Sequence, residues 1–176
     1  MKKVVCFVIF IFGALIVPSC SKDDGDVELK AWMMDDDGVE TYEFNEGSLI
    51  VFSLRISNNT SEDYDVRYSL WGNNLFRVYS EDGKDMGLPF KGYVSPIGRT
   101  PKYEGERMED ICWTLKPGEN FIIYCSWSGL NREDKYNASY PLGKTEDFTP
   151  THLSPGNYYT SFKIGEIEFK MKFVIK

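Results

Sequence analysis

The ten residues 48–57, SLIVFSLRIS, alternate apolar and mixed side chains with the period of a β-strand. One side of this stretch carries Ile50, Phe52, Leu54 and Ile56, and the other carries Leu49, Val51, Ser53 and Arg55. Successive side chains of a strand point to opposite faces of its sheet. The pattern therefore predicts a strand whose uniformly apolar side faces a hydrophobic core.

A second stretch, EIEFKMKFVI at 166–175, alternates apolar residues with Glu168, Lys170 and Lys172. Shorter alternations follow at 64–70 and 121–127. This pattern is typical of antiparallel strands with one face in the core and one face in water. We find no window with a 3.6-residue apolar period, so we expect at most a turn or two of helix.

Turn-forming residues separate these runs at short intervals. Leu115-Lys116-Pro117-Gly118 and Leu153-Ser154-Pro155-Gly156 nearly repeat each other, and proline followed by glycine suits a type II turn. We predict an all-β fold, an antiparallel immunoglobulin-like β-sandwich of about 7–9 strands. Two long stretches, 86–107 and 128–151, interrupt the rhythm, and loops of this length commonly carry function.

The N-terminus carries a targeting pattern. Lys2 and Lys3 precede an uncharged apolar run, 4–17, which is too short to span a bilayer comfortably. Val17-Pro18-Ser19-Cys20 then resembles a bacterial lipobox, in which the cysteine becomes the lipidated first residue of the mature protein. We therefore expect residues 1–20 to be a lipoprotein signal peptide and Cys20 to be the lipidation site.

Residues 21–26, SKDDGD, form an acidic run that we expect to be a flexible tether. The run resembles the export signal that sends Bacteroidota lipoproteins to the outer face of the outer membrane. The expected location is therefore the outer membrane, lipid-anchored and facing the exterior, with its periplasmic face as the alternative.

The net charge of the chain limits the kinds of binding partner that we expect. The chain of 176 residues has 20 basic and 27 acidic residues, a net charge of −7. Removal of Lys2 and Lys3 with the signal leaves 18 against 27, a net charge of −9. Nucleic-acid binders carry clustered positive charge, so we expect no nucleic-acid partner. Residues 27–176 suffice for one domain with a sizeable core.

Three segments follow one another in an order that resembles a known protein family. They are Ile56-Ser57-Asn58-Asn59-Thr60, the Trp113–Glu119 segment and Leu153-Ser154-Pro155-Gly156. These residues are similar to the immunoglobulin-like domain of the BsuPI-type proteinase inhibitor family over roughly residues 46–165. The resemblance implies the fold, and it suggests a proteinase inhibitor as an alternative function. The chain departs from that family in its lipoprotein signal and its long insert before Leu153.

Residues suited to catalysis or metal binding are few. His152 is the only histidine, and its place before a turn favours a surface role over that of a general base. Asp35-Asp36-Asp37-Gly38 lacks the alternating acids of an EF-hand, and we interpret it as a connecting turn. We expect no enzymatic activity, no cofactor and no metal site.

Cys112 and Cys125 remain after the signal peptide and the lipidated cysteine are set aside. They flank the Pro117-Gly118 turn, so a hairpin could bring them together. Exported domains can form disulfides. Buried free thiols on apolar strand faces are the equal alternative.

Aromatic side chains are the binding candidates. Trp32 and Trp71 fall on the polar side of their strands, whereas Trp113 and Trp127 fall on core sides. Tyr136 and Tyr140 lie in the long insert. Exposed aromatic rings can stack on a sugar or anchor a protein interface, although a covering loop would make any of them structural.

These observations favour a membrane-anchored, non-enzymatic binding or accessory lipoprotein that contacts a protein or glycan partner through its loops. A proteinase inhibitor and a carbohydrate-binding surface protein are the alternatives. The carbohydrate hypothesis requires exposed rings among Trp32, Trp71, Tyr136 and Tyr140.

Overall fold

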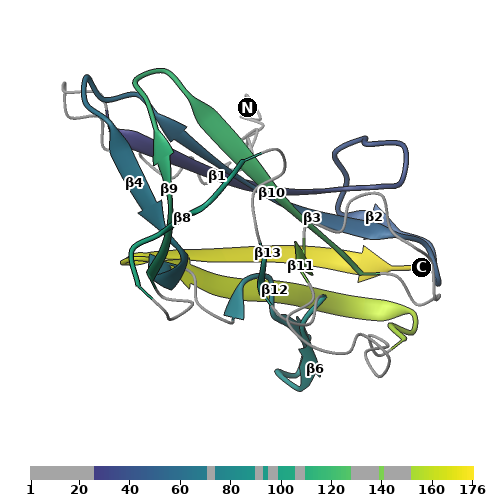
Figure 1. The fold of residues 1–176 in the computed structure, drawn as a ribbon. Helices are drawn as coiled ribbons and strands as arrows, with labels where there is room; N and C mark the ends of the chain where they lie inside the picture. The colour runs from purple at the N-terminus through teal and green to yellow at the C-terminus, as the bar shows by residue number, and fades with distance from the viewer. Residues whose placement is uncertain are drawn as a thin grey trace, which may run out of the picture.

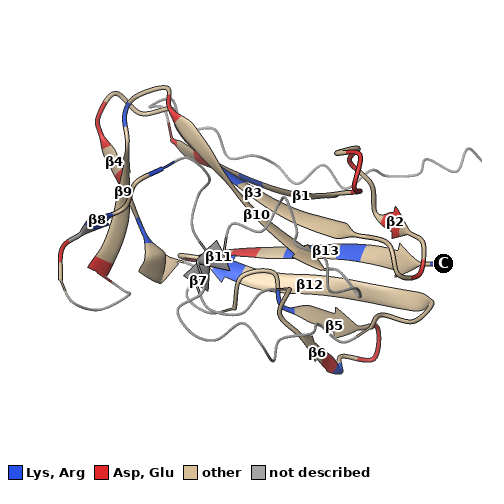
Figure 2. Ribbon diagram, turned by 45° about the vertical axis from the view of Figure 1, so that its right-hand side comes forward, with Lys and Arg blue, Asp and Glu red and all other residues tan. Residues whose placement is uncertain are grey.

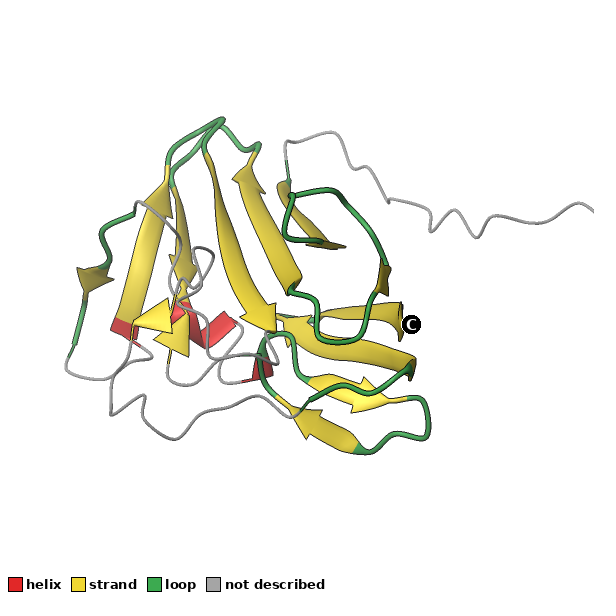
Figure 3. Cartoon of the chain, turned by 90° about the vertical axis from the view of Figure 1, so that its right-hand side faces the viewer, coloured by secondary structure: helices red, strands yellow, loops and turns green. Residues whose placement is uncertain are grey.

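The computed structural model describes residues 26–70, 74–89, 93–94, 99–105, 110–127, 139–140 and 152–176. The expected signal peptide, 1–20, and nearly all of the expected tether, 21–26, lie outside these residues. The described chain is all-β, with a short 3₁₀ turn at Tyr68–Leu70, and none of its helices has the length and apolarity needed to cross a membrane. Figure 3 shows how strands dominate the described chain.

Thirteen strands occur in the described residues, more than expected, because several are only two residues long. They are β1 (Val27–Met34), β2 (Glu43–Phe44), β3 (Ile50–Asn58), β4 (Tyr64–Arg67), β5 (Val78–Ser80), β6 (Asp85–Gly87), β7 (Tyr93–Val94), β8 (Lys102–Tyr103), β9 (Ile111–Leu115), β10 (Asn120–Trp127), β11 (Ser139–Tyr140), β12 (Gly156–Ile164) and β13 (Ile167–Ile175).

The strands form three main sheets and one small pair. The β3 sheet has the order β1-β3-β10, the β12 sheet has the order β2-β13-β12-β5-β6, and the β9 sheet has the order β4-β9-β8. β7 and β11 pair separately. The β3 sheet lies above β12 and β13, and the β9 sheet lies at one end of the molecule (Figure 1).

The hydrophobic core lies between these sheets. β3 contributes Ile50, Phe52, Leu54 and Ile56, as the sequence predicts. The buried aromatic rings of the core include Phe44, Phe52, Phe76, Trp113, Phe121, Trp127, Phe162 and Phe173. The expected core positions of Trp113 and Trp127 are confirmed.

One strand pair departs from the antiparallel expectation. β2 runs parallel to β13, with Val174 opposite Glu43 and Ile175 opposite Phe44. The other strand pairs in the described chain are antiparallel. The chain reaches this arrangement because it crosses from the β3 sheet to the β12 sheet after β1, through residues 35–42.

The turn between β9 and β10 anchors the end of β3. The amide of Glu119 donates to the carbonyl of Lys116 at 2.9 Å, and Gly118 has a φ of 76°, so this is the expected type II turn. The Gly118 amide donates to the Asn58 carbonyl at 2.7 Å. The second Pro-Gly pair forms a bend, and Gly156 is already the first residue of β12.

Phe76 adopts an unusual backbone conformation. Its φ of 60° lies in the left-handed region, which a bulky residue rarely occupies. The ring is fully buried and stacks on Phe52 at 5.5 Å between centroids, with Phe162 edge-on at 4.9 Å. Packing between the two sheets therefore holds a conformation that costs about 1–3 kcal/mol.

Candidate functional site

Of the four aromatic residues singled out in the sequence, the structure describes one completely. Trp71 and Tyr136 lie outside the described residues. Tyr140 belongs to β11, where its backbone pairs with Tyr93 of β7. The long stretches 86–107 and 128–151 are described only in part. The site is therefore built around Trp32.

Trp32 lies on the outer face of the β3 sheet. Its neighbours in β1, Ala31 and Met33, pair with Leu54 and Phe52 on the core face. Trp32 itself pairs with Ser53, and Ser53 pairs on its other side with Tyr124 of β10. Two partly buried aromatic side chains thus flank a serine across three strands. We call Trp32, Ser53 and Tyr124 the Trp32 row.

Ser53 is the unusual member of the row. Its residue is 0% exposed, and its hydroxyl oxygen has no hydrogen-bond partner among the described residues. An unpaired buried hydroxyl costs about 1–3 kcal/mol. Trp32 and Tyr124 lie on either side of Ser53 in the sheet. The Ser53 hydroxyl is therefore a buried donor and acceptor without a partner, between two aromatic residues.

Charged residues border the row, and their charges are matched. Arg55, two residues from Ser53 on the same face, pairs with Glu28 at 3.4 Å. Lys30 lies 3.9 Å from Glu40, and its ammonium is 5.5 Å from the centroid of the Trp32 ring. Arg55 Nε is buried and has no hydrogen-bond partner in the described chain. The row thus offers aromatic ring surface bordered by paired charges.

The two cysteines occupy different sheets. Cys112 and Cys125 carry reduced, buried thiols. The hairpin that would bring them together does not form, because β9 pairs with β4 and β8 whereas β10 pairs with β3. Cys125 faces the core opposite Phe52, as expected. Cys112 does not lie on an apolar face; it is buried beneath charged side chains of the β9 sheet.

The surroundings of Cys112 place three ligand types close together. Asp65, Glu104 and Cys112 each bring one ligand atom within 4.8 Å of the others. Arg67, however, donates to Glu104 at 2.7 Å, and so a cation already occupies that carboxylate. Burial, and then the carboxylates of Glu104 and Asp65, raise the pKa of the Cys112 thiol. A protonated thiol is a poor nucleophile, so Cys112 is not set up for nucleophilic chemistry.

His152 and the acidic segment near residue 35 have structural partners. His152 is exposed, and its Nε2 lies 2.9 Å from Glu46 Oε1. Asp35 accepts hydrogen bonds from the amides of Asp37, at 3.0 Å, and Val39, at 2.9 Å. Gly38, with a φ of 81°, completes the expected turn after β1. The Asp35 carboxylate therefore serves the backbone of its own turn.

Comparisons of the chain with protein-family models, with curated proteins and with solved structures find no match.

Sequence reasoning placed Trp32 on the outer side of β1, and this placement is confirmed by the register. It did not find Ser53 or Tyr124. Alternation assigns Ser53 to the outer face of its strand, yet a serine there is ordinary. Its significance arises from the side chains opposite it, and strand register between segments far apart in sequence is not visible in either segment alone.

Proposed function

We propose that the protein is a lipid-anchored, non-enzymatic binding module of the outer membrane that faces the cell exterior. The anchor is supported by Lys2 and Lys3, the apolar run 4–17 and Cys20. Incorporation of labelled palmitate into the full-length protein tests it directly. We expect the label to be lost in Cys20→Ser, and retained label in that variant would contradict the anchor.

We also propose that the domain is an immunoglobulin-like β-sandwich. The support is topological: the N-terminal segment supplies β1 to one sheet and β2 to the facing sheet, beside the last strand. A sandwich of this kind presents two outer sheet faces and loops at its ends. The Trp32 row occupies one of the outer faces.

The Trp32 row is the proposed binding surface, and the two partly exposed aromatic residues on the outer face of the β3 sheet, Trp32 and Tyr124, are the observation that carries this proposal. A neutral glycan suits the row best, because aromatic rings pack on the apolar face of a sugar. The matched charges of Lys30 and Arg55 leave little to attract a charged ligand.

The test is binding of the full-length protein, in detergent, to an array of neutral oligosaccharides. We expect Trp32→Ala to abolish binding, and Tyr42→Ala to retain it, since Tyr42 is a 40% exposed aromatic residue outside the row. Binding that survives Trp32→Ala would remove the row from the proposal. A protein captured in stoichiometric amount by wild type and lost in Trp32→Ala would make the partner a protein.

A further inference from the structure

The outer face of the β12 sheet differs from the Trp32 row in charge. Side chains at alternate positions of β12 point into the core, including Tyr158, Thr160 and Phe162. The intervening positions, with those of β13, form the opposite face. Its exposed charged residues on these two strands are Lys163, Glu168, Lys170 and Lys172. The blue and red segments of these strands are visible in Figure 2.

Strand register brings the lysines beside an aromatic pair. Lys172 of β13 lies opposite Tyr159 of β12, which lies opposite Tyr79 of β5. The two tyrosine rings stack at 5.2 Å between centroids with an angle of 19°. The Lys170 ammonium lies 4.2 Å from the centroid of the Tyr159 ring. We call Lys170, Lys172, Tyr159 and Tyr79 the lysine–tyrosine cluster.

The aromatic pair positions the cation. Tyr79 and Lys170 belong to the two strands that flank β12, so they approach the Tyr159 ring from different sides. The Tyr159 ring is then already in contact with Tyr79 and with Lys170. It is therefore better placed to hold the Lys170 ammonium than to stack on a base or sugar of a ligand. A cation over the face of an aromatic ring is attracted by the ring electrons. It holds the ammonium group of Lys170 over the sheet.

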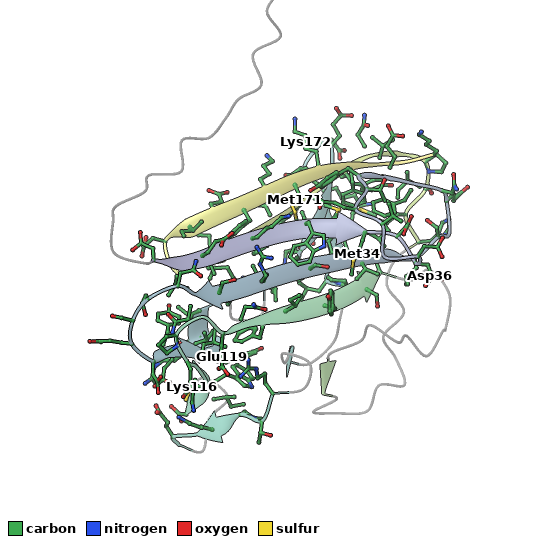
Figure 4. The ribbon with its side chains drawn as sticks, turned by 90° about the horizontal axis from the view of Figure 1, so that it is seen from above. Met34, Asp36, Lys116, Glu119, Met171 and Lys172 are labelled. Atoms are coloured by element: carbon green, nitrogen blue, oxygen red, sulfur yellow. The ribbon has the colours of Figure 1, made fainter. Side chains whose placement is uncertain are left out.

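The lysines of this face differ from its arginine. Arg77 pairs with Asp85. Within the described residues, Lys163, Lys170 and Lys172 have no ion pair, and Glu168 accepts a hydrogen bond from Ser161 at 3.4 Å. Side chains two residues apart on a strand are separated by about 6.6 Å along it. Lys172 and Met171 mark this strand in Figure 4, which views the molecule from above.

We infer that the lysine–tyrosine cluster binds an acidic polysaccharide through carboxylate groups on its sugars. Charge complementarity supports this occupant. The chain as a whole has a net charge of −7 and repels polyanions, so a polyanion must approach a locally positive face. A chain of uronic acids offers repeated carboxylates that adjacent ammonium groups can share. The cluster lies on the side of the molecule opposite the Trp32 row and does not depend on it.

The probe is polygalacturonate, titrated into the full-length protein in detergent at low ionic strength. We expect binding that weakens about tenfold or more in Lys170→Gln/Lys172→Gln. The matched control is Lys102→Gln/Lys116→Gln, which removes the same charge from the β9 sheet and its turn, and it should bind like wild type. Added salt should weaken the wild-type complex, because the attraction is electrostatic and exposed.

A second pair of variants tests the positioning role of Tyr159. Tyr159→Phe keeps the ring and should retain binding, whereas Tyr159→Leu removes the cation–π contact and should weaken binding severalfold. Thermal unfolding of each variant shows whether it remains folded at the titration temperature. Equal affinity of the two variants would overturn the positioning role.

Four results would overturn the proposal as a whole. These are no binding of polygalacturonate, equal loss in the control double variant, unchanged binding in Lys170→Gln/Lys172→Gln, and equal affinity for polyglutamate or single-stranded oligothymidylate. The last result would identify a surface that accepts any polyanion. Failure of the Trp32 row to bind neutral sugars would leave these expectations unchanged.

Discussion

β3 and β13 are both nine-residue strands with one uniformly apolar side, and they differ in what happens on the other side. In β3 the second side is also largely buried, with Val51 and Ser53 both 0% exposed. In β13 the second side faces solvent, and its Lys170 and Lys172 are exposed. Each strand lies between two partners in its sheet.

The difference arises from the neighbouring side chains. Beside Ser53 stand Trp32 and Tyr124, which are large enough to exclude water from a small residue between them. Beside Lys172 stands Tyr159, and the long lysine side chain extends past it. Whether a residue on an outer strand face is buried thus depends on its size relative to the side chains opposite it on the neighbouring strands. A small polar residue between two aromatic ones becomes buried, and its hydroxyl loses water.

The largest expected effect is a loss of stability from substitutions on the apolar side that both strands turn toward the core. Leu54→Ala removes a fully buried side chain at the centre of β3 and should lower the free energy of unfolding by about 2–5 kcal/mol. Met171→Ala, at a partly buried position of β13, should cost clearly less. Urea unfolding of both variants measures the difference. Equal losses would mean that the two strands contribute equally to the core.

Replacement of the outward serines sharpens the contrast. Ser53→Ala removes a buried hydroxyl without a partner and should raise the free energy of unfolding by up to about 1 kcal/mol. Ser161→Ala, on the outer face of β12, should change it by less than about 0.5 kcal/mol. Destabilisation by Ser53→Ala would show that its hydroxyl has a partner.

The smallest effect concerns the turn that anchors β3. Lys116 and Glu119 lie in this turn, at the end of the molecule away from Asp36 (Figure 4). The Glu119 carboxylate accepts the Lys116 amide, at 3.0 Å, and pairs with Arg99, at 3.1 Å. The amide hydrogen bond, and then the Arg99 guanidinium, lower the pKa of Glu119 from its ordinary value of 4.5.

A lowered pKa in the folded state means that Glu119 stabilises the fold above its unfolded pKa. This contribution is lost as the pH falls through the folded pKa. Thermal unfolding between pH 6 and pH 3 should therefore show a shallower decline in Glu119→Gln than in wild type. Parallel declines would show that the carboxylate contributes nothing to the pH dependence. Glu62→Gln is a matched control, because the hydrogen bonds of Glu62 in the described chain are made by its backbone.

The sequence was sufficient for the features set by local rules. Alternation located β3 and β13 and their core sides, and Pro117-Gly118 specified a type II turn. The position of Cys112 was predicted wrongly, because its apolar neighbours in sequence, Ile111 and Trp113, lie on the other face of β9. The sequence also did not predict which strands pair with each other. β9 and β10 are joined by a tight turn and yet belong to different sheets.

These misses share a physical cause. Whether two strands joined by a short turn form a hairpin depends on which other edges are available, and those edges come from distant parts of the chain. The parallel contact of β2 with β13 is an example, since it joins residues near 43 to residues near 175. Local propensity carries no information about such pairs.

The pairing of β2 with β13 also sets the order in which the protein can assemble. β13 is the last strand, and it alone bridges β2 to β12 in the described sheet. Lys176, directly after β13, donates its amide to the Phe44 carbonyl at 2.8 Å. Contacts this distant in sequence form slowly. A chain that emerges N-terminus first therefore holds β2 without its sheet partner until β13 has emerged, so this sheet closes late in folding.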